Sequence, residues 1–161
     1  VDVVAEMQGK ILMAECKFHH AAHVKSDVKT SLYVKARFDD IRDRLGKDTS
    51  PVALQFTPML ITNTRFTMDA EKYGECSGLK LMAWDHPQGN SLKDWIDRSG
   101  LHPLTVLKSI TKKELKTLMK EGVVLCREII EQPASLDLLD LTQRRKNSII
   151  KEARALSENQ D

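Results

Sequence analysis

The sequence lacks the cysteine pattern of a disulfide scaffold or a zinc module. It has only three cysteines, Cys16, Cys76 and Cys126, and no two of them form a CxxC pair. An odd, scattered set of this kind predicts reduced thiols and argues against a zinc knuckle. We therefore expect a cytoplasmic protein that is stabilised by its apolar core rather than by cross-links.

Long apolar runs and an excess of one charge are also missing. No run approaches the roughly 18 residues that span a membrane, and no signal peptide is visible. The 25 Lys and Arg residues oppose 23 Asp and Glu residues. Because the overall field is weak, the sequence predicts no membrane partner, and any site for nucleic acid must come from a local arrangement of charge.

The 161 residues, 41% of them apolar, suffice for one domain, or for one domain with a small appendage. Strand-like and helical patterns alternate up to residue 85, whereas everything after the turn-rich residues 85–90 is helical. The sequence therefore predicts an α/β domain over residues 1–85, with a mixed sheet and flanking helices, followed by a small all-helical region over residues 91–161. The chain does not begin with Met, and its second residue already belongs to a motif, so we expect more chain upstream.

Apolar periodicity and end signals locate the individual elements. Strands are expected at residues 1–6, 11–18, 58–62 and 79–84. Helices are expected at residues 26–45 with Gly46 as the cap, at residues 67–78, after the capping-box pattern that runs from Thr111 to Glu114, and at residues 143–156.

The first two expected strands form a hairpin with three charged residues on one face. A loop centred between Gln8 and Gly9 places Asp2 directly opposite Glu15, with Cβ atoms about 4.5–5.5 Å apart. Lys17 shares this face because side chains alternate along a strand. The opposite face is apolar and is expected to lie under a helix. Its members are Val3, Ala5, Leu12, Ala14, Cys16 and Phe18.

Two carboxylates at this separation repel each other unless a cation lies between them. Hard oxygen ligands suit Mg²⁺ or Mn²⁺, and an ammonium beside them can orient an attacking water and stabilise charge on a phosphate. The trio of Asp2, Glu15 and Lys17 therefore predicts a site that hydrolyses phosphodiesters. The alternative is an edge hairpin with an ordinary cross-strand ion cluster.

Asp2, the hairpin and the triplet Glu15-Cys16-Lys17 resemble the D…(E/Q)xK core of the PD-(D/E)xK nuclease superfamily. With the later segments PMLITNTRFT and GLKLMAWD, residues 1–85 resemble the Mrr-like restriction endonuclease branch. The resemblance implies that Asp2, Glu15 and the Cys16 carbonyl ligate Mg²⁺ (or Mn²⁺) while Lys17 assists the attacking water. It also implies DNA as the substrate. A homodimer is expected because nucleases that cut both strands often pair.

Relatives in that branch carry a helix and a strand before the aspartate, and some carry a regulatory ATP-cone domain upstream. The chain as given begins after these elements. The resemblance therefore implies a nuclease core that is incomplete at its N-terminus, with the activity of this chain alone left open.

A polar segment follows the strand expected at residues 58–62, at the edge of the sheet where α/β proteins bind ligands. Its residues Thr62, Asn63, Thr64 and Arg65 offer hydroxyl groups, an amide and a cation that suit a phosphate. The alternative is a plain capping loop before the next helix.

Three further groups of residues suggest contacts with metal or DNA. His19, His20 and His23 form an HHxxH cluster, which is either a metal site or a set of surface histidines. The helix at residues 26–45 carries Lys25, Lys29, Lys35 and Arg37 among aspartates, so it is either a DNA-facing stripe or a solvated mixed face. A local basic cluster near the C-terminus consists of Arg144, Arg145, Lys146 and Lys151.

Residues 112–156 resemble helix-hairpin-helix modules, which contact DNA phosphates through the backbone amides of the hairpin. We expect DNA contact here, including the basic cluster, with a plain helical bundle as the alternative. The first expectation for the whole chain is a Mg²⁺-dependent endodeoxyribonuclease. The alternatives are a binding module for nucleic acid or nucleotide that does not cleave, and a protein-interaction domain.

Overall fold

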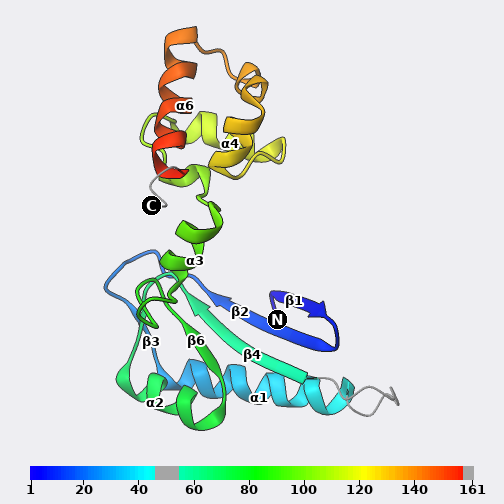
Figure 1. Ribbon diagram of the computed structural model, residues 1–161. Helices are drawn as coiled ribbons and strands as arrows, with labels where there is room; N and C mark the ends of the chain where they lie inside the picture. The colour runs from blue at the N-terminus through cyan, green and yellow to red at the C-terminus, as the bar shows by residue number, and fades with distance from the viewer. Residues whose placement is uncertain (46–54, 158–161) are drawn as a thin grey trace. The chain divides into compact units, whose positions relative to one another are not determined.

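The computed structural model describes residues 1–45 and 55–157. These divide into two compact units, Val1–Asp94 and Trp95–Asp161, so the division falls a few residues beyond the expected turn at 85–90. The predicted fold class is confirmed, because a mixed α/β sheet with flanking helices is followed by a helical region (Figure 1). Within the described residues, no helix combines the length and apolar character needed to cross a membrane.

The first unit is built on a four-stranded sheet in the order β1-β2-β4-β6. Strand β1 is antiparallel to β2, whereas β2, β4 and β6 run parallel. A separate short pair, β3 and β5, is also parallel. The strands are β1 (Val3–Met7), β2 (Lys10–Lys17), β3 (Lys25–Ser26), β4 (Gln55–Thr62), β5 (Arg65–Phe66) and β6 (Lys80–Met82).

The β1–β2 hairpin has the predicted register. Gln8 and Gly9 have φ angles of 51° and 76°, and these two left-handed residues form the loop. Such a loop matches the twist of the flanking strands. Pairing runs from Met7 opposite Lys10 to Val3 opposite Ala14. Continued by one residue, this register sets Asp2 opposite Glu15.

Helices α1 (Val28–Leu45) and α2 (Met68–Ser77) cover one face of the sheet (Figure 1). Val34 and Phe38 of α1 pack there with strand residues such as Ile11, Met13 and Leu60. The other face carries a smaller cluster of Ala14, Met59 and Met82, against which Leu92 packs at the start of α3 (Leu92–Ser99). Strand β2 is therefore apolar on both of its faces.

The expected apolar face of the hairpin is wrong for four of its six members. Val3 is 46% exposed and Phe18 is 66% exposed, and Ala5 and Cys16 are exposed as well. The face beneath α1 is the opposite one, which carries Ile11 and Met13. Because β2 is an interior strand, both of its faces are apolar, and the apolar pattern cannot indicate which face the helices cover.

Local end signals behave as predicted at α2. The Thr67 hydroxyl accepts the backbone N–H of Ala70, and Gly78 ends the helix with a φ of 73°. Helix α1 begins later than expected, because Ser26 pairs with Phe66 in the short β3–β5 ladder. The predicted cap at Gly46 lies outside the described residues.

The second unit consists of short helices around one core. They are a 3₁₀ helix η1 (Leu104–Val106), α4 (Lys112–Lys120), α5 (Cys126–Glu131), a 3₁₀ helix η2 (Pro133–Leu138) and α6 (Gln143–Ser157). Leu118, Ile129 and Ile149 are fully buried at its centre. The predicted capping box is confirmed, since Thr111 and Glu114 exchange side-chain bonds with each other's backbone at the start of α4.

Candidate functional site

Asp2 is fastened to the strand that carries Glu15 and Lys17. Its backbone N–H donates to the Ala14 carbonyl at 3.0 Å, and its Oδ2 accepts the backbone N–H of Cys16 at 2.7 Å. The carboxyl group of Asp2 therefore lies beside the backbone of the Glu15-Cys16-Lys17 triplet. The hairpin brings these predicted residues together as the sequence indicated.

Glu15 lies on the face of the sheet that α1 covers. It pairs in register with buried Leu60, and Nη1 of Arg37 from α1 lies 3.2 Å from its Oε1. The Glu15 side chain is 20% exposed, so this carboxylate is half-buried and faces the guanidinium of Arg37.

The pKa of the Cys16 thiol is affected by burial and by the negative charges of Asp2 and Glu15. Burial raises the pKa of Cys16, and the charges of Asp2 and Glu15 raise it further. Both carboxylates are thus close enough to disfavour a third negative charge. A cation bound between them would relieve this repulsion.

Lys17 is the last residue of β2 and pairs with Thr62 of β4. By strand alternation its side chain shares the face of Glu15. It is exposed and, among the residues that the structure describes, its ammonium makes no ion pair. A free ammonium two residues from the carboxylate is what the predicted hydrolytic role requires.

Sequence reasoning missed Arg37 as the partner of Glu15. Lys29, Tyr33 and Arg37 are exposed and four residues apart, so they share one strip of α1. The four-residue spacing of these side chains was the signal that the sequence offered. Only the contact between Arg37 and Glu15 in the structure shows that this strip faces the end of β2. Lys35 instead pairs with Asp39 at 2.6 Å, as the mixed-face alternative expected.

The segment at the end of β4, which begins at Thr62, is bonded to the loop that follows β2. Thr62 and Thr64 are 1% and 4% exposed, so their hydroxyl groups are turned inward. Asn63 makes two bonds to the backbone of His19, accepting its N–H at 2.8 Å and donating to its carbonyl at 2.9 Å. These contacts favour the capping-loop alternative for the three residues.

Arg65 is the exposed member of that segment. Its guanidinium lies 3.0 Å from Asp85, and 65% of its side chain is exposed. An exposed ion pair of this kind is easily exchanged for another anion. Arg65 is therefore the residue of this segment that a phosphate can reach.

The histidine cluster is spread over different contacts. Nε2 of His19 lies 2.9 Å from the Ser26 hydroxyl, and the His20 ring meets Phe18 edge-on at 5.1 Å. Within residues 1–45 and 55–157, no three His, Cys, Asp or Glu side chains gather to hold a metal. The metal ligands expected from the sequence are fewer: the carboxylates of Asp2 and Glu15 and the carbonyl of Cys16. These hard oxygens suit Mg²⁺ or Mn²⁺.

Two of the four residues of the basic cluster in the second unit, Arg145 and Lys146, are engaged in ion pairs. Arg145 forms a two-pronged ion pair with Glu114, at 2.7 and 3.1 Å, and this guanidinium helps to hold the pKa of Glu114 at about 2. Lys146 lies 2.5 Å from Asp137. The other two residues of this cluster, Arg144 and Lys151, are exposed without an ion pair among the described residues.

The connection between α4 and α5 is a tight turn at Gly122, whose φ is 82°. A helix-hairpin-helix module would offer the amides of this turn to a phosphate. Here the Glu128 carboxylate accepts the N–H groups of Val124 and Leu125 at 2.7 and 2.8 Å. Two of the amides are therefore already bound within the protein.

Comparisons of this chain with protein families, protein sequences and solved structures are consistent with one another. Residues 102–157 match the family model described as AF1548-like, C-terminal. An uncharacterized protein of Archaeoglobus fulgidus is 35% identical over 156 residues, which cover 96% of this chain and 83% of that protein. The crystal structure of a protein of unknown function, AF1548, is similar with a TM-score of 0.68 at 30% identity, covering 96% of this chain and 79% of that one. The chain belongs to the AF1548-like family.

Proposed function

We propose that this protein is a Mg²⁺- or Mn²⁺-dependent endonuclease that hydrolyses phosphodiester bonds in DNA, in the cytoplasm. One juxtaposition carries the proposal: Asp2 is bonded to the backbone beside Glu15, and the free ammonium of Lys17 follows two residues later. The resemblance of residues 1–85 to Mrr-like PD-(D/E)xK nucleases supports the same assignment.

Each residue has a distinct task in this proposal. Asp2, Glu15 and the Cys16 carbonyl hold the ion, which when bound supplies Lewis-acid activation of water and phosphate. Lys17 orients the attacking water and stabilises the negative charge that grows on the phosphate. Arg37, whose guanidinium lies 3.2 Å from Glu15 and is exposed, would be available to contact the DNA backbone beside this site.

The test is nicking of supercoiled plasmid with Mn²⁺. We expect Lys17→Ala to lower the rate by about 100-fold or more, and EDTA to abolish nicking. Lys10→Ala is the matched control, because Lys10 is an exposed lysine at the other end of β2. Equal nicking by wild type and Lys17→Ala would contradict the proposal. The proposal would also fail if neither this chain nor a longer natural chain that contains it nicked the plasmid.

A second candidate is a nucleic-acid- or nucleotide-binding module with this fold that does not cleave. The ion pair between Glu15 and Arg37 favours it, because a protein without a metal can keep that pair permanently. Titration with Mn²⁺ separates the two candidates. A nuclease binds the ion and loses it in Glu15→Gln, whereas a binding module need not. Absence of salt-dependent DNA binding would leave the protein-interaction alternative.

A further inference from the structure

Helix α6 carries an exposed basic stripe that the nuclease proposal does not use. We define the α6 basic face by Arg144, Asn147, Lys151 and Arg154, which are all exposed. Their spacing of three, four and three residues keeps them on one side of the helix. Buried Ile149 and Ala153 lie on the opposite side, in the core of the second unit. The stripe therefore points away from that core.

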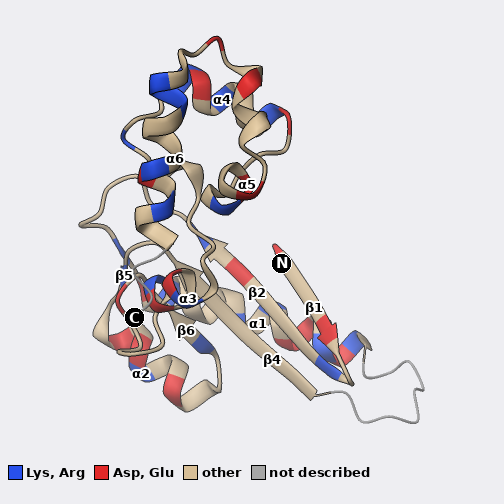
Figure 2. Ribbon diagram, turned by 45° about the horizontal axis from the view of Figure 1, so that its top comes forward, with Lys and Arg blue, Asp and Glu red and all other residues tan. Residues whose placement is uncertain are grey.

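Within the part of the chain that the structure describes, no carboxylate pairs with the cations of this face. Arg144, Lys151 and Arg154 make no ion pair with any residue that the structure describes. Glu152, the sole acidic residue of α6, accepts the N–H groups of Lys108 and Ser109 at 2.7 and 2.9 Å. Blue segments, which mark Lys and Arg, recur along the ribbon of α6 in Figure 2. Three positive charges along the helix are thus without an ion pair among residues 1–45 and 55–157.

Arg144 is unfavourable for the helix itself. It lies in the first turn of α6, which has no acidic residue. The positive end of the helix dipole repels a cation at this position. Its neighbours Arg145 and Lys146 are compensated by Glu114 and Asp137, whereas Arg144 is not. A charge that the fold does not need suggests an external anion.

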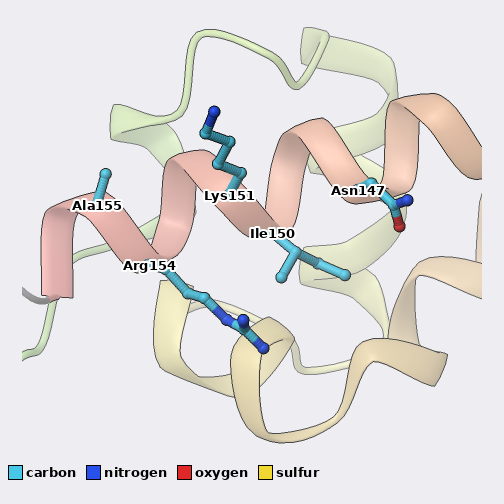
Figure 3. Close-up of a pocket in the computed structure, with 5 residues that line it drawn as sticks. All are labelled: Asn147, Ile150, Lys151, Arg154 and Ala155. Carbon is cyan, nitrogen blue, oxygen red and sulfur yellow. The ribbon is translucent and has the colours of Figure 1, made fainter.

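The surface over the C-terminal half of the face is concave. A hollow of about 570 Å³ is lined by Asn147, Ile150, Lys151, Arg154 and Ala155 (Figure 3). In this view the side chains of Lys151 and Ala155 extend upward from α6, and those of Ile150 and Arg154 extend downward. Cations and an amide around an aliphatic side chain suit a sugar-phosphate chain, which alternates anionic and less polar groups.

We propose that the α6 basic face binds the phosphate backbone of duplex DNA. The three cations are spread over ten residues, or about 15 Å of helix, rather than converging on one point. An extended polyanion matches such a row better than a compact ion does, since each DNA strand carries a phosphate about every 3.4 Å. The face reads no bases and holds the duplex without regard to sequence. This inference deepens the proposed nuclease function by naming where the substrate is held.

The experiment measures anisotropy of a labelled 20-bp duplex in EDTA, between 50 and 200 mM KCl. The variant Arg144→Gln/Lys151→Gln/Arg154→Gln removes the face. We expect the slope of log K against log salt to fall by about 2.7, and the affinity at 50 mM KCl to drop at least about 10-fold. The matched control, Lys112→Gln/Lys113→Gln/Lys116→Gln, removes the same charge from exposed positions on α4 and should change the slope by less than about 1.

Several results would overturn the assignment. Equal losses in the two triple variants would indicate a general charge effect, and an unchanged slope in the α6 variant would exclude the face. Failure of the wild type to bind the duplex would also reject it. So would an α6 triple variant that still binds DNA but no longer binds phosphatidylserine vesicles, because the face would then serve a membrane. Thermal unfolding by circular dichroism checks that both variants are folded. Because EDTA removes cleavage, this result is independent of the nicking assay.

Discussion

Glu15 of the first unit differs from three glutamates of the second unit in what its carboxylate binds. In the second unit, Glu128 and Glu152 each accept two backbone N–H groups, and Glu114 joins one backbone N–H to Arg145. In the first unit, Glu15 instead faces the cationic side chain of Arg37. Glu15 can exchange its cation for another at little cost, whereas Glu128 and Glu152 cannot turn away without leaving backbone donors unbonded.

The largest effect on stability should come from Glu152→Gln. The variant weakens charge-assisted bonds to the backbone of Lys108 and Ser109, so we expect the free energy of unfolding to fall by about 1.5–3 kcal/mol. Urea unfolding followed by circular dichroism measures it. Glu131→Gln is the control, since Glu131 is exposed and makes no side-chain bond within the described residues. A similar loss of stability in Glu131→Gln would mean that the backbone bonds of Glu152 contribute nothing special to the fold.

Glu114 should make the second unit sensitive to acid. Its pKa is lowered from 4.5 to about 2, chiefly by the hydrogen bond from Arg145. A lowered pKa means that the ionised form stabilises the fold. This contribution is complete above about pH 4.5 and is lost as the pH falls toward 2.

The matching experiment compares wild type with Glu114→Gln at pH 6, 4 and 2.5. We expect the variant to be less stable by about 1–2 kcal/mol at pH 6, with a difference that shrinks toward zero in acid. Urea midpoints at the three values measure this. A constant difference across the range would mean that the charge of Glu114 contributes nothing.

Glu15→Gln should have a smaller effect on stability than either of these variants. Its ion pair with Arg37 is largely exposed on the arginine side, so we expect a change within about 1 kcal/mol. The same variant should lower the affinity for Mn²⁺ by about tenfold or more, measured by calorimetry. A stability loss as large as that of Glu152→Gln would place Glu15 among the structural carboxylates.

The smallest effect should come from Arg65→Gln. The pair between Arg65 and Asp85 is exposed on both sides, so the free energy of unfolding should stay within about 0.5 kcal/mol of wild type. A weaker affinity for a DNA duplex at unchanged stability would assign Arg65 to substrate binding. Unchanged DNA affinity would leave it as a loop contact.

Much of the fold was predictable because its signals are local. The loop at Gln8 and Gly9, the cap at Thr67 and the capping box at Thr111 each depend on only a few neighbouring residues. Which face of β2 the helices cover was not predictable. Ile11 and Met13 on one face are as apolar as Leu12 on the other, so only packing of the whole sheet decides.

The candidate site divides in the same way. Asp2, Glu15 and Lys17 come together through a hairpin register that the sequence determines. The partner of Glu15 on α1 and the two bonds between Asn63 and His19 depend on parallel pairing with β4, far along the chain. Nothing in the spacing of the basic residues indicated that Arg145 and Lys146 would be taken by Glu114 and Asp137. Contacts of this range require the tertiary structure.

The pairing of β2 with β4 also has a kinetic consequence. Its partners, from Lys10 with Gln55 to Lys17 with Thr62, are 45 positions apart, whereas the hairpin closes over two residues. Hairpins form in about 1–10 μs, but a parallel pair must first bear the entropy of a long loop closure. Asp2, Glu15 and Lys17 therefore come together as soon as the hairpin forms, while the other edge of β2 stays unpaired until β4 reaches it. We expect the pairing of this site with β4 to be among the last contacts of the first unit to form during folding.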